Sequence, residues 1–224
     1  MTNPEDQIAA ASRITAGCFP GNWIRSSSLR VTEGPQLPRW SVDRGIYHIS
    51  LHQADSIPAV ERQRWIELRE ELKARVRQEA RALSEDEREL LRVAYDERIE
   101  RYLRTGAGSC LLADARSSEA LAETLEQANG KLYALHRYVV MPNHLHVIAE
   151  IFKAEDLDRV VQGWKRVSSH RINRCLARTG KVWMEDAYTR IIRTAAEYER
   201  QMAYVWQNPE AAGLTGGFRR KDFS

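Results

Sequence analysis

A chain of 224 residues is long enough for one sizeable hydrophobic core, and its formal net charge of +3 is too small to identify a partner. At 43% hydrophobic and 29% charged residues, the composition is that of a folded globular protein, which excludes a disordered chain. The three cysteines are widely spaced and odd in number, so they predict neither a disulfide framework nor a cysteine zinc site. No apolar run approaches the length of a membrane span and no signal peptide is recognisable, so we expect a cytoplasmic protein without a membrane partner.

The first part of the chain is expected to be an irregular arm followed by a strand. Residues 1–40 are rich in Gly, Pro, Ser and Asn and keep neither a helical nor a strand period. Apolar and polar side chains then alternate over residues 45–53, which predicts a strand. Its polar face carries His48 and His52, and we expect these two side chains to be solvated rather than to bind a metal.

Residues 55–105 change character and are expected to form an inserted pair of long, charged helices. Ser84 and Glu87 make a capping box at the start of the second helix. Between Ala54 and Arg104 there are 13 acidic and 12 basic residues. Such a balance predicts a mixed-charge hairpin held by pairs of opposite charges one helical turn apart, rather than a clamp for nucleic acid.

A helix and two strands are expected to follow this insertion. The helix covers about residues 117–128 and ends at a glycine, and the first strand covers about residues 132–141. Pro142 and Asn143 form the turn, because a turn does not need the N–H that proline lacks. The second strand runs over residues 144–152, so that the two strands make a hairpin.

Two histidines stand one residue apart just after this turn. Side chains alternate between the faces of a strand, so His144 and His146 point the same way. Two imidazoles held in this way can share one divalent cation, although a hydrogen-bonded pair at the surface fits the same pattern. Glu150 is in phase with both histidines and is either a partner that orients one of them or a solvated carboxylate.

The following helix, expected over residues 157–178, is basic. From Leu157 to Arg193 there are nine Lys and Arg residues against three acidic ones. We expect this helix to pack beside the strand of the two histidines, which favours phosphate binding over a merely solvated basic face. A last strand is expected over residues 187–193. The candidate DNA-binding residues of this helix and strand are Trp164, Lys165, Arg166, Arg171, Arg190 and Arg193.

The final helix is expected to begin with a capping box of Thr194 and Glu197 and to end at Pro209. Tyr204 lies off its apolar stripe, and Asn208, four residues further on, shares a polar face with it. Spacing alone leaves this tyrosine as a packing residue with a wet hydroxyl.

Two blocks in this order carry a resemblance to a known family: M-P-N-H-x-H at residues 141–146 and Y-x-x-x-N-P-x-x-A-G-L at residues 204–214. Over about residues 39–214 the chain resembles the REP-associated tyrosine transposases. These are HUH endonucleases with a single catalytic tyrosine, where U stands for a hydrophobic residue. The arm before Arg39 adds nothing to the resemblance, and the charged hairpin is longer than in compact members.

The resemblance implies an α+β, ferredoxin-like fold (β-α-β-β-α-β) with an antiparallel sheet, followed by a helix that bears the tyrosine. It assigns residues 41–214 to the transposase domain and leaves 215–224 as a C-terminal tail. It further implies that Tyr204 is the nucleophile and that His144, His146 and Asn208 bind Mg²⁺ or Mn²⁺. The implied substrate is single-stranded DNA folded into hairpins at palindromic repeats, cleaved through a 5′-phosphotyrosine intermediate by a monomer or a homodimer. The order of strands and helices expected from the residues agrees with this fold.

Two other functions are compatible with parts of the pattern. One is a domesticated relative that binds DNA hairpins without cleaving them, although all four site residues are present. The other is a cupin-like metal enzyme, because His144, His146 and Glu150 have the spacing of a short cupin motif. A cupin needs an all-β barrel, whereas this sequence predicts a largely helical chain with about four strands.

Overall fold

The computed structural model describes residues 30–32, 39–78, 99 and 102–223. The strands in this part of the chain are β1 (Arg30–Thr32), β2 (Arg39–Ser41), β3 (Gly45–His52), β4 (Tyr133–Val140), β5 (His144–Ile151), β6 (Tyr188–Ile191) and β7 (Arg219–Asp222). The helices are α2 (Ala59–Gln78), α4 (Ala115–Glu126), α5 (Leu157–Cys175) and α6 (Ala195–Ala211), with short 3-10 turns η2 (Leu111–Ala113) and η3 (Ala154–Asp156).

The centre of the fold is an antiparallel sheet of five strands in the order β6-β3-β5-β4-β7. The chain passes through β3, α4, β4, β5, α5 and β6 in that sequence. This is the expected β-α-β-β-α-β arrangement, and the fold prediction is confirmed. In the register of β3 and β5, Ser50 lies opposite His146 and His52 lies opposite His144. The histidines of both strands therefore share one face of the sheet.

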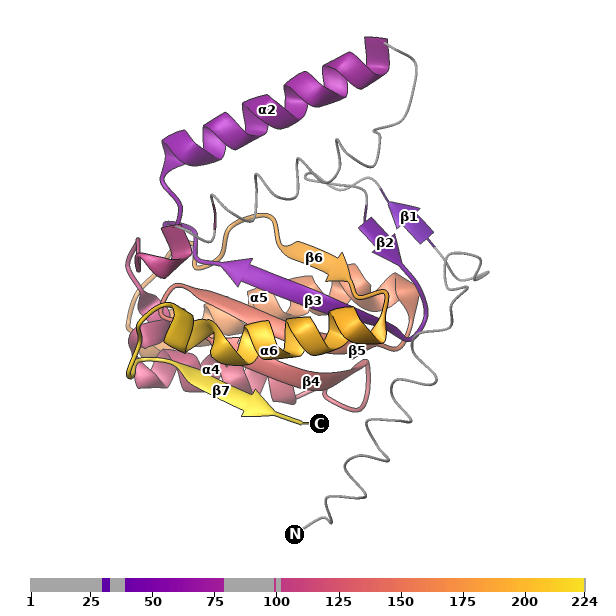
Figure 1. The fold of residues 1–224 in the computed structure, drawn as a ribbon. Coiled ribbons are helices and arrows are strands. Elements are labelled where there is room, and N and C mark those ends of the chain that lie inside the picture. Colours follow the sequence, from indigo (N-terminus) through magenta and orange to yellow (C-terminus); the bar gives the residue numbers. More distant parts are fainter. Residues whose placement is uncertain (1–29, 33–38, 79–98, 100–101, 224) are drawn as a thin grey trace.

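The two faces of the sheet are covered by different helices. Figure 1 shows α6 in front of the sheet and α4 and α5 behind it, while α2 projects away from the sheet. The larger core joins α4 and α5 to the odd-numbered residues of β5, such as Leu145 and Val147. A second core joins α6 to Ile148 and its neighbours on the other face. β5 is thus buried on both sides, and its alternation decides which residues face each helical layer.

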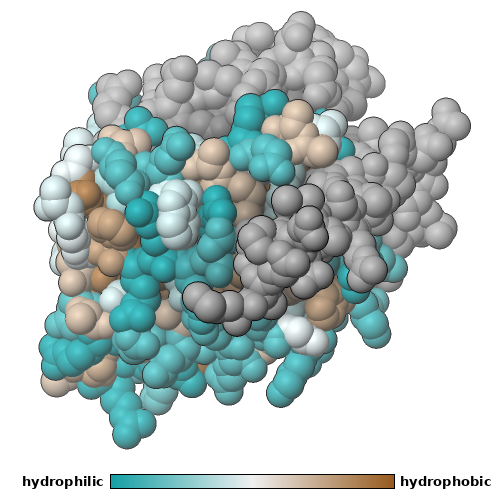
Figure 2. Space-filling view, turned by 60° about the horizontal axis from the view of Figure 1, so that its bottom comes forward, coloured by the Kyte–Doolittle hydropathy of each residue, from teal (hydrophilic) through white to brown (hydrophobic). Residues whose placement is uncertain are grey.

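The exposed surface is polar over most of the face seen in Figure 2, with hydrophobic residues in small groups. Among the described residues, Val60 of α2 is the one large hydrophobic side chain that is mostly exposed, at 62%. In the same part of the chain, no helix combines the length and the apolar character that a membrane span requires.

The two ends of the chain contain strands that the sequence analysis did not predict. β1 and β2 form a small antiparallel pair at the end of the N-terminal arm. Residues 215–224, expected to be a tail, include β7, which pairs with β4 and adds an edge strand. Each charged side chain of β7 reaches an oppositely charged residue of another element, which the short charged sequence does not reveal. These ion pairs are Arg219–Glu119, Arg220–Glu210, Lys221–Glu126 and Arg137–Asp222.

The inserted hairpin is described in part. Its first helix is α2, while the capping box of Ser84 and Glu87 lies outside the described residues. The end of the second helix returns to the body of the protein, where Ile99 and Leu103 are buried.

The final helix does not end at Pro209, as we expected, but continues to Ala211. In the last turn of a helix, a proline costs one backbone hydrogen bond and need not stop the chain. The carbonyl groups before it are still used, since Asn208 O accepts from Ala212 N at 3.0 Å. Asn208 consequently stays on the helical face that it shares with Tyr204.

The packing of α5 predicts a large stability effect at Trp164, which is buried and donates from Nε1 to the hydroxyl of Tyr133 at 2.9 Å. Trp164→Ala should lower the free energy of unfolding by about 3–5 kcal/mol, because it leaves a cavity in the larger core. Urea denaturation followed by far-UV circular dichroism measures the change. Arg166→Ala, at an exposed site on the same helix, is the control and should stay within about 0.5 kcal/mol of the wild type. Equal stability of the two variants would contradict this packing.

Candidate active site and metal centre

The expected pair of histidines lies in the interior, under α6. His144 and His146 are 0% and 1% exposed, and their ring centroids are 4.7 Å apart. They share the face of β5 that α6 covers, because Ile148, in phase with them, packs into the core of that helix. The prediction that the two imidazoles point the same way is confirmed, and the alternative of a pair at the surface is excluded.

α6 brings the candidate tyrosine to these histidines. Thr194 caps the helix as expected, since its Oγ1 accepts from Glu197 N at 3.1 Å, whereas Glu197 Oε2 accepts from Arg193 N at 2.9 Å, one residue before the N–H that would complete a capping box. Three turns later, the ring of Tyr204 lies 5.4 Å from the ring of His146, centroid to centroid, in an edge contact. Residues 58 positions apart in the sequence thus meet at one point of the interface between sheet and helix.

Asn208 faces the other histidine. It is 2% exposed and lies close enough to His144 to favour the protonated form of that imidazole. Nevertheless, within the described part of the chain, neither His144 Nε2 nor Asn208 Oδ1 makes a hydrogen bond of normal geometry. Two adjacent buried acceptor atoms without a donor are costly unless something else satisfies them. A cation bound by an imidazole nitrogen and an amide oxygen would do so.

Burial keeps the histidines neutral, as metal ligands must be. Desolvation, assisted by the neighbouring His52, lowers the pKa of His144 from 6.5 to about 3. The pKa of His146 is lowered well below 6.5, again mainly by burial and then by the adjacent His144. Both rings therefore offer a lone pair at neutral pH.

The third ligand has to come from an amide. Among the described residues, no group of three His, Cys, Asp or Glu side chains could hold a metal ion. Two histidines and Asn208 supply two nitrogen donors and one oxygen donor, a mixed set suited to first-row divalent cations, whereas Mg²⁺ more often takes all-oxygen sites. The residues present therefore fit a divalent cation.

The structure also places residues in the site that the sequence analysis missed or misjudged. His48 and His52, expected to be solvated, are 5% and 4% exposed. His48 Nε2 lies 3.1 Å from His146 Nδ1, and the hydroxyl of Ser50 lies 2.7 Å from the same nitrogen. The sequence shows that His48, Ser50 and His52 alternate along one strand and share a face. It does not show that α6 buries this face, because that contact is tertiary. His48 and Ser50 therefore contact His146 at Nδ1 and can orient its ring.

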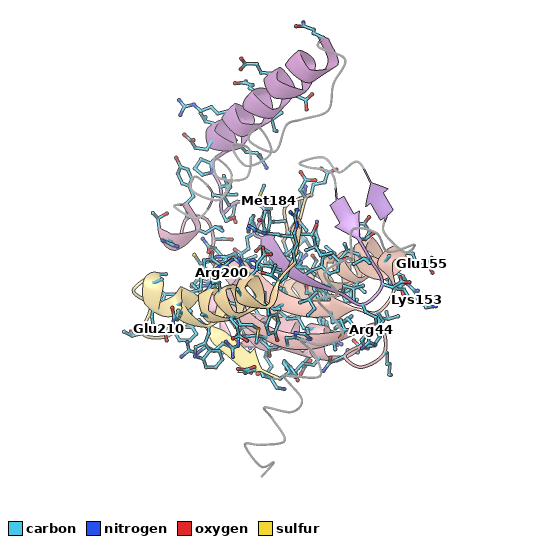
Figure 3. All side chains as sticks on the ribbon, turned by 45° about the vertical axis from the view of Figure 1, so that its right-hand side comes forward. Arg44, Lys153, Glu155, Met184, Arg200 and Glu210 are labelled. Carbon is cyan, nitrogen blue, oxygen red and sulfur yellow. The ribbon has the colours of Figure 1, made fainter. Side chains whose placement is uncertain are left out.

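Glu150 does not take this supporting role. Its carboxylate pairs with Arg44 Nε at 2.5 Å. Glu150 lies four residues along the strand from His146, which is about 13 Å at the rise of a strand. Figure 3 shows Arg44, with Lys153 and Glu155, at the end of the sheet away from Glu210. Glu150 is a buried ion-pair partner, neither solvated nor attached to the histidines.

The basic helix lies on the opposite side of the sheet from the histidines. The helix does pack against the strand of the two histidines, as expected, but on the face opposite to their side chains, in the larger core with α4. Trp164 is buried, and Lys165, also buried, donates to Glu185 O. Arg171 pairs with Glu123 of α4 at 3.4 Å, and Arg166 is exposed.

The two arginines of the next segment are closer to the site. Arg190 lies opposite His48 in the register of β6 and β3, and its charge helps to lower the pKa of His48. It pairs with Glu197 at 2.6 Å. Arg193 is exposed at the start of α6. Arg104, which the sequence analysis did not select, is exposed at the end of the insertion, and its charge helps to lower the pKa values of both central histidines.

Two other tyrosines, Tyr188 and Tyr198, are the alternatives to Tyr204 as the nucleophile, and they have different positions. Tyr198 is buried in the core of α6, and its hydroxyl lies 3.0 Å from His136 Nδ1. Tyr188 is nearer to the site, with its ring centroid 6.0 Å from that of His48. The ring of Tyr204 contacts that of His146, and Tyr204, like Tyr198, lies on the helix that carries Asn208.

A comparison with protein families bears on the same residues. Residues 112–207 match the model of the family described as "Transposase IS200 like". The similarity to IS200-like transposases is therefore shown for this segment. The match includes His144, His146 and Tyr204 and stops one residue before Asn208. The matched segment runs from η2 into α6 and stops before the helix ends, while β3, with its two buried histidines, precedes it.

Two further comparisons are less informative. No curated protein shows significant similarity to the chain. Among solved structures, the chain is similar to a REP-associated tyrosine transposase bound to a REP hairpin, with 11% identity and a TM-score of 0.43 over 79% of this chain and 73% of the other. The fold assignment rests on the strand order of this chain itself.

The buried histidines predict that acid destabilises the protein. The pKa values of His48 and His52 are lowered by burial to about 3 and about 4, from 6.5. At a pH between the lowered pKa values and 6.5, the unfolded chain binds protons that the folded chain does not. The free energy of unfolding should therefore fall as the pH drops below about 6.5. Urea denaturation midpoints across this range measure it. His52→Gln should make the pH dependence shallower. A midpoint that does not change with pH would contradict the neutral state of these rings.

Proposed function

We propose that this transposase is a single-tyrosine HUH nuclease and strand transferase that cleaves single-stranded DNA at hairpin-forming repeats. The observation that carries the proposal is the meeting of the half-buried Tyr204 with the buried His144, His146 and Asn208 between β5 and α6. Three of these residues lie within the matched transposase core. The two sequence blocks that resemble REP-associated tyrosine transposases supply the hairpin substrate as a hypothesis.

The side chain of Tyr204 would carry out the chemistry. Its Oη attacks the phosphorus of the scissile phosphate, and the bond from phosphorus to the 3′ oxygen of the preceding nucleotide breaks. The phenol gives up its proton and the leaving oxygen takes one, so that the products are a 5′-phosphotyrosine and a free 3′-OH. The bond energy is kept in the phosphotyrosine, and a second strand end can be joined without ATP.

A free phenol, with a pKa near 10, is a weak nucleophile at neutral pH. Here the ring is held at one position by edge contacts with His146 and His48, at centroid distances of 5.4 and 5.7 Å. Holding the nucleophile on a fixed line of attack removes a large part of the activation barrier in such reactions. His144, His146 and Asn208 would hold Mg²⁺ or Mn²⁺, which when bound supplies charge to polarise the scissile phosphate.

The positive charges near the histidines indicate where the DNA backbone would approach. Arg104 and Arg190 both act on the histidine cluster electrostatically, and Arg190 is one third exposed. Arg193 stands exposed at the start of α6. We therefore expect phosphate contacts at these three arginines, and we expect the basic residues of α5 to contribute little, because α5 lies on the other face.

Metal dependence tests the ligand assignment. Cleavage of a single-stranded hairpin should need Mg²⁺ or Mn²⁺ and should be lost in chelator or in His146→Ala, because the neutral ring is one of three proposed ligands. Cleavage is measured with a labelled oligonucleotide on a denaturing gel. His170→Ala removes an exposed histidine of α5 and should retain full activity. Full cleavage in the presence of chelator would refute the metal site.

The covalent step tests the nucleophile. Tyr204→Phe removes one hydroxyl and leaves the ring contacts and the ligands in place, so hairpin binding should persist while cleavage disappears. With a 3′-labelled hairpin, the wild type should give a protein-linked band on a denaturing gel and Tyr204→Phe should give none.

The two neighbouring tyrosines provide matched controls for this experiment. Tyr188→Phe and Tyr198→Phe should both keep the protein-linked band, even though the second loses its contact with His136. A band that survives in Tyr204→Phe and is lost in Tyr188→Phe would assign the reaction to the other tyrosine beside His48. Hairpin binding by the wild type without any cleavage would favour a domesticated DNA-binding protein.

A further inference from the structure

Asn143, the second residue of the turn between β4 and β5, is completely buried and makes three side-chain contacts. The sequence analysis treated it only as a turn residue. Its Oδ1 lies 2.7 Å from Nδ1 of His144, the next residue in the chain. Its Nδ2 donates to Leu103 O at 3.2 Å and to Ala107 O at 3.0 Å.

These contacts determine which way the amide group points. The carbonyl oxygens of Leu103 and Ala107 can only accept hydrogen bonds, so the NH₂ group of Asn143 must face them. The oxygen of the amide is consequently the atom that faces His144. An amide oxygen can only accept, so Nδ1 of His144 must carry a proton.

The state of His144 follows from this single bond. An imidazole that binds a metal is neutral and carries one proton. With the proton on Nδ1, the lone pair is on Nε2, the buried atom that makes no hydrogen bond in the described part of the chain. The nitrogen available for a metal is therefore determined before any metal binds.

The two carbonyl groups that hold Asn143 belong to the returning end of the helical insertion. This end is attached to the body of the protein at several points. Gln53 bridges it to the turn, since its Oε1 accepts from Leu111 N at 3.2 Å and its Nε2 donates to Pro142 O at 3.4 Å. Asp55 accepts from Ser109 N at 2.9 Å. The end of the insertion is thus a fixed support for the Asn143 amide.

We propose that Asn143 is a positioning residue that holds His144 in the Nδ1–H tautomer, with Nε2 directed to the metal, and that the returning end of the insertion holds Asn143 in place. The inference rests on the proposed role of His144 as a ligand. It gives the insertion a function in the active site in addition to any contact with DNA.

The other histidine is held differently, which makes the effect specific. His146 Nδ1 lies 2.7 Å from the hydroxyl of Ser50, and a hydroxyl can either donate or accept. That contact does not by itself select a tautomer. A change at Asn143 should therefore act on His144 and leave His146 as it is.

The tautomer can be read directly in the metal-free wild type. Two-bond ¹H–¹⁵N correlation spectra of protein labelled with ¹⁵N-histidine distinguish the two neutral forms, and His144→Gln identifies the signals of this residue. We expect His144 to be protonated at Nδ1 at neutral pH. Protonation at Nε2, or a mixture of both forms, would overturn the inference and needs no variant of Asn143.

Metal affinity is the second measurement, made with Mn²⁺ and detected by the electron paramagnetic resonance of the free ion. Asn143→Ala removes the acceptor and should weaken Mn²⁺ binding about 10–100-fold, as is typical when a partner that orients a metal ligand is lost. Asn143→Asp keeps an acceptor for Nδ1–H but cannot donate to the two carbonyl groups that hold the side chain in place. Its Mn²⁺ binding should therefore be weakened, but less than that of Asn143→Ala.

A matched control is Asn129→Ala, which removes another asparagine whose side chain bonds to the backbone, at 2.8 Å from Leu135 N and away from the site. It should lower stability without changing Mn²⁺ affinity. Unchanged Mn²⁺ binding by folded Asn143→Ala would overturn the inference and leave the metal site intact. Absence of Mn²⁺ binding by the wild type would overturn both the metal site and the inference.

Discussion

The arrangement of this protein depends on β5 being buried on both faces. Because side chains alternate along a strand, a single register assigns Leu145 and Val147 to the core with α4 and α5, and His144 and His146 to the interface with α6. A shift of one residue would exchange the two sets and place imidazoles in the apolar core. The apolar packing on one face therefore determines the position of the proposed metal ligands on the other.

Burial of the histidines has a cost and a use. Four imidazoles of β3 and β5 lie under α6 with pKa values lowered by desolvation. Groups removed from water in this way must find partners inside the protein, and two of them do so through Ser50 and Asn143. The same burial keeps the rings neutral and supplies the dry surroundings in which a cation and a phosphate interact strongly.

α6 must be held accurately, since it carries both Tyr204 and Asn208. Its start is capped by Thr194, and its last turns are held by β7. Arg220 donates to Trp206 O and to Glu210, with its guanidinium 4.1 Å from the centre of the Trp206 ring. A site shared between a strand and a helix needs contacts at both ends of the helix to keep its geometry.

The sequence by itself determined the order of strands and helices, the common face of His144 and His146, and the common face of Tyr204 and Asn208. All of these follow from local periodicity, and the two sequence blocks added the family. Only the tertiary structure decided what lies on each side of the sheet. It placed the basic helix away from the histidines, buried His48 and His52 under α6, and turned the short segment around Arg220 into an edge strand. It also brought the end of the insertion to Asn143. Periodicity shows which residues share a face of one element, but the contacts of that face are made by residues far away in the chain.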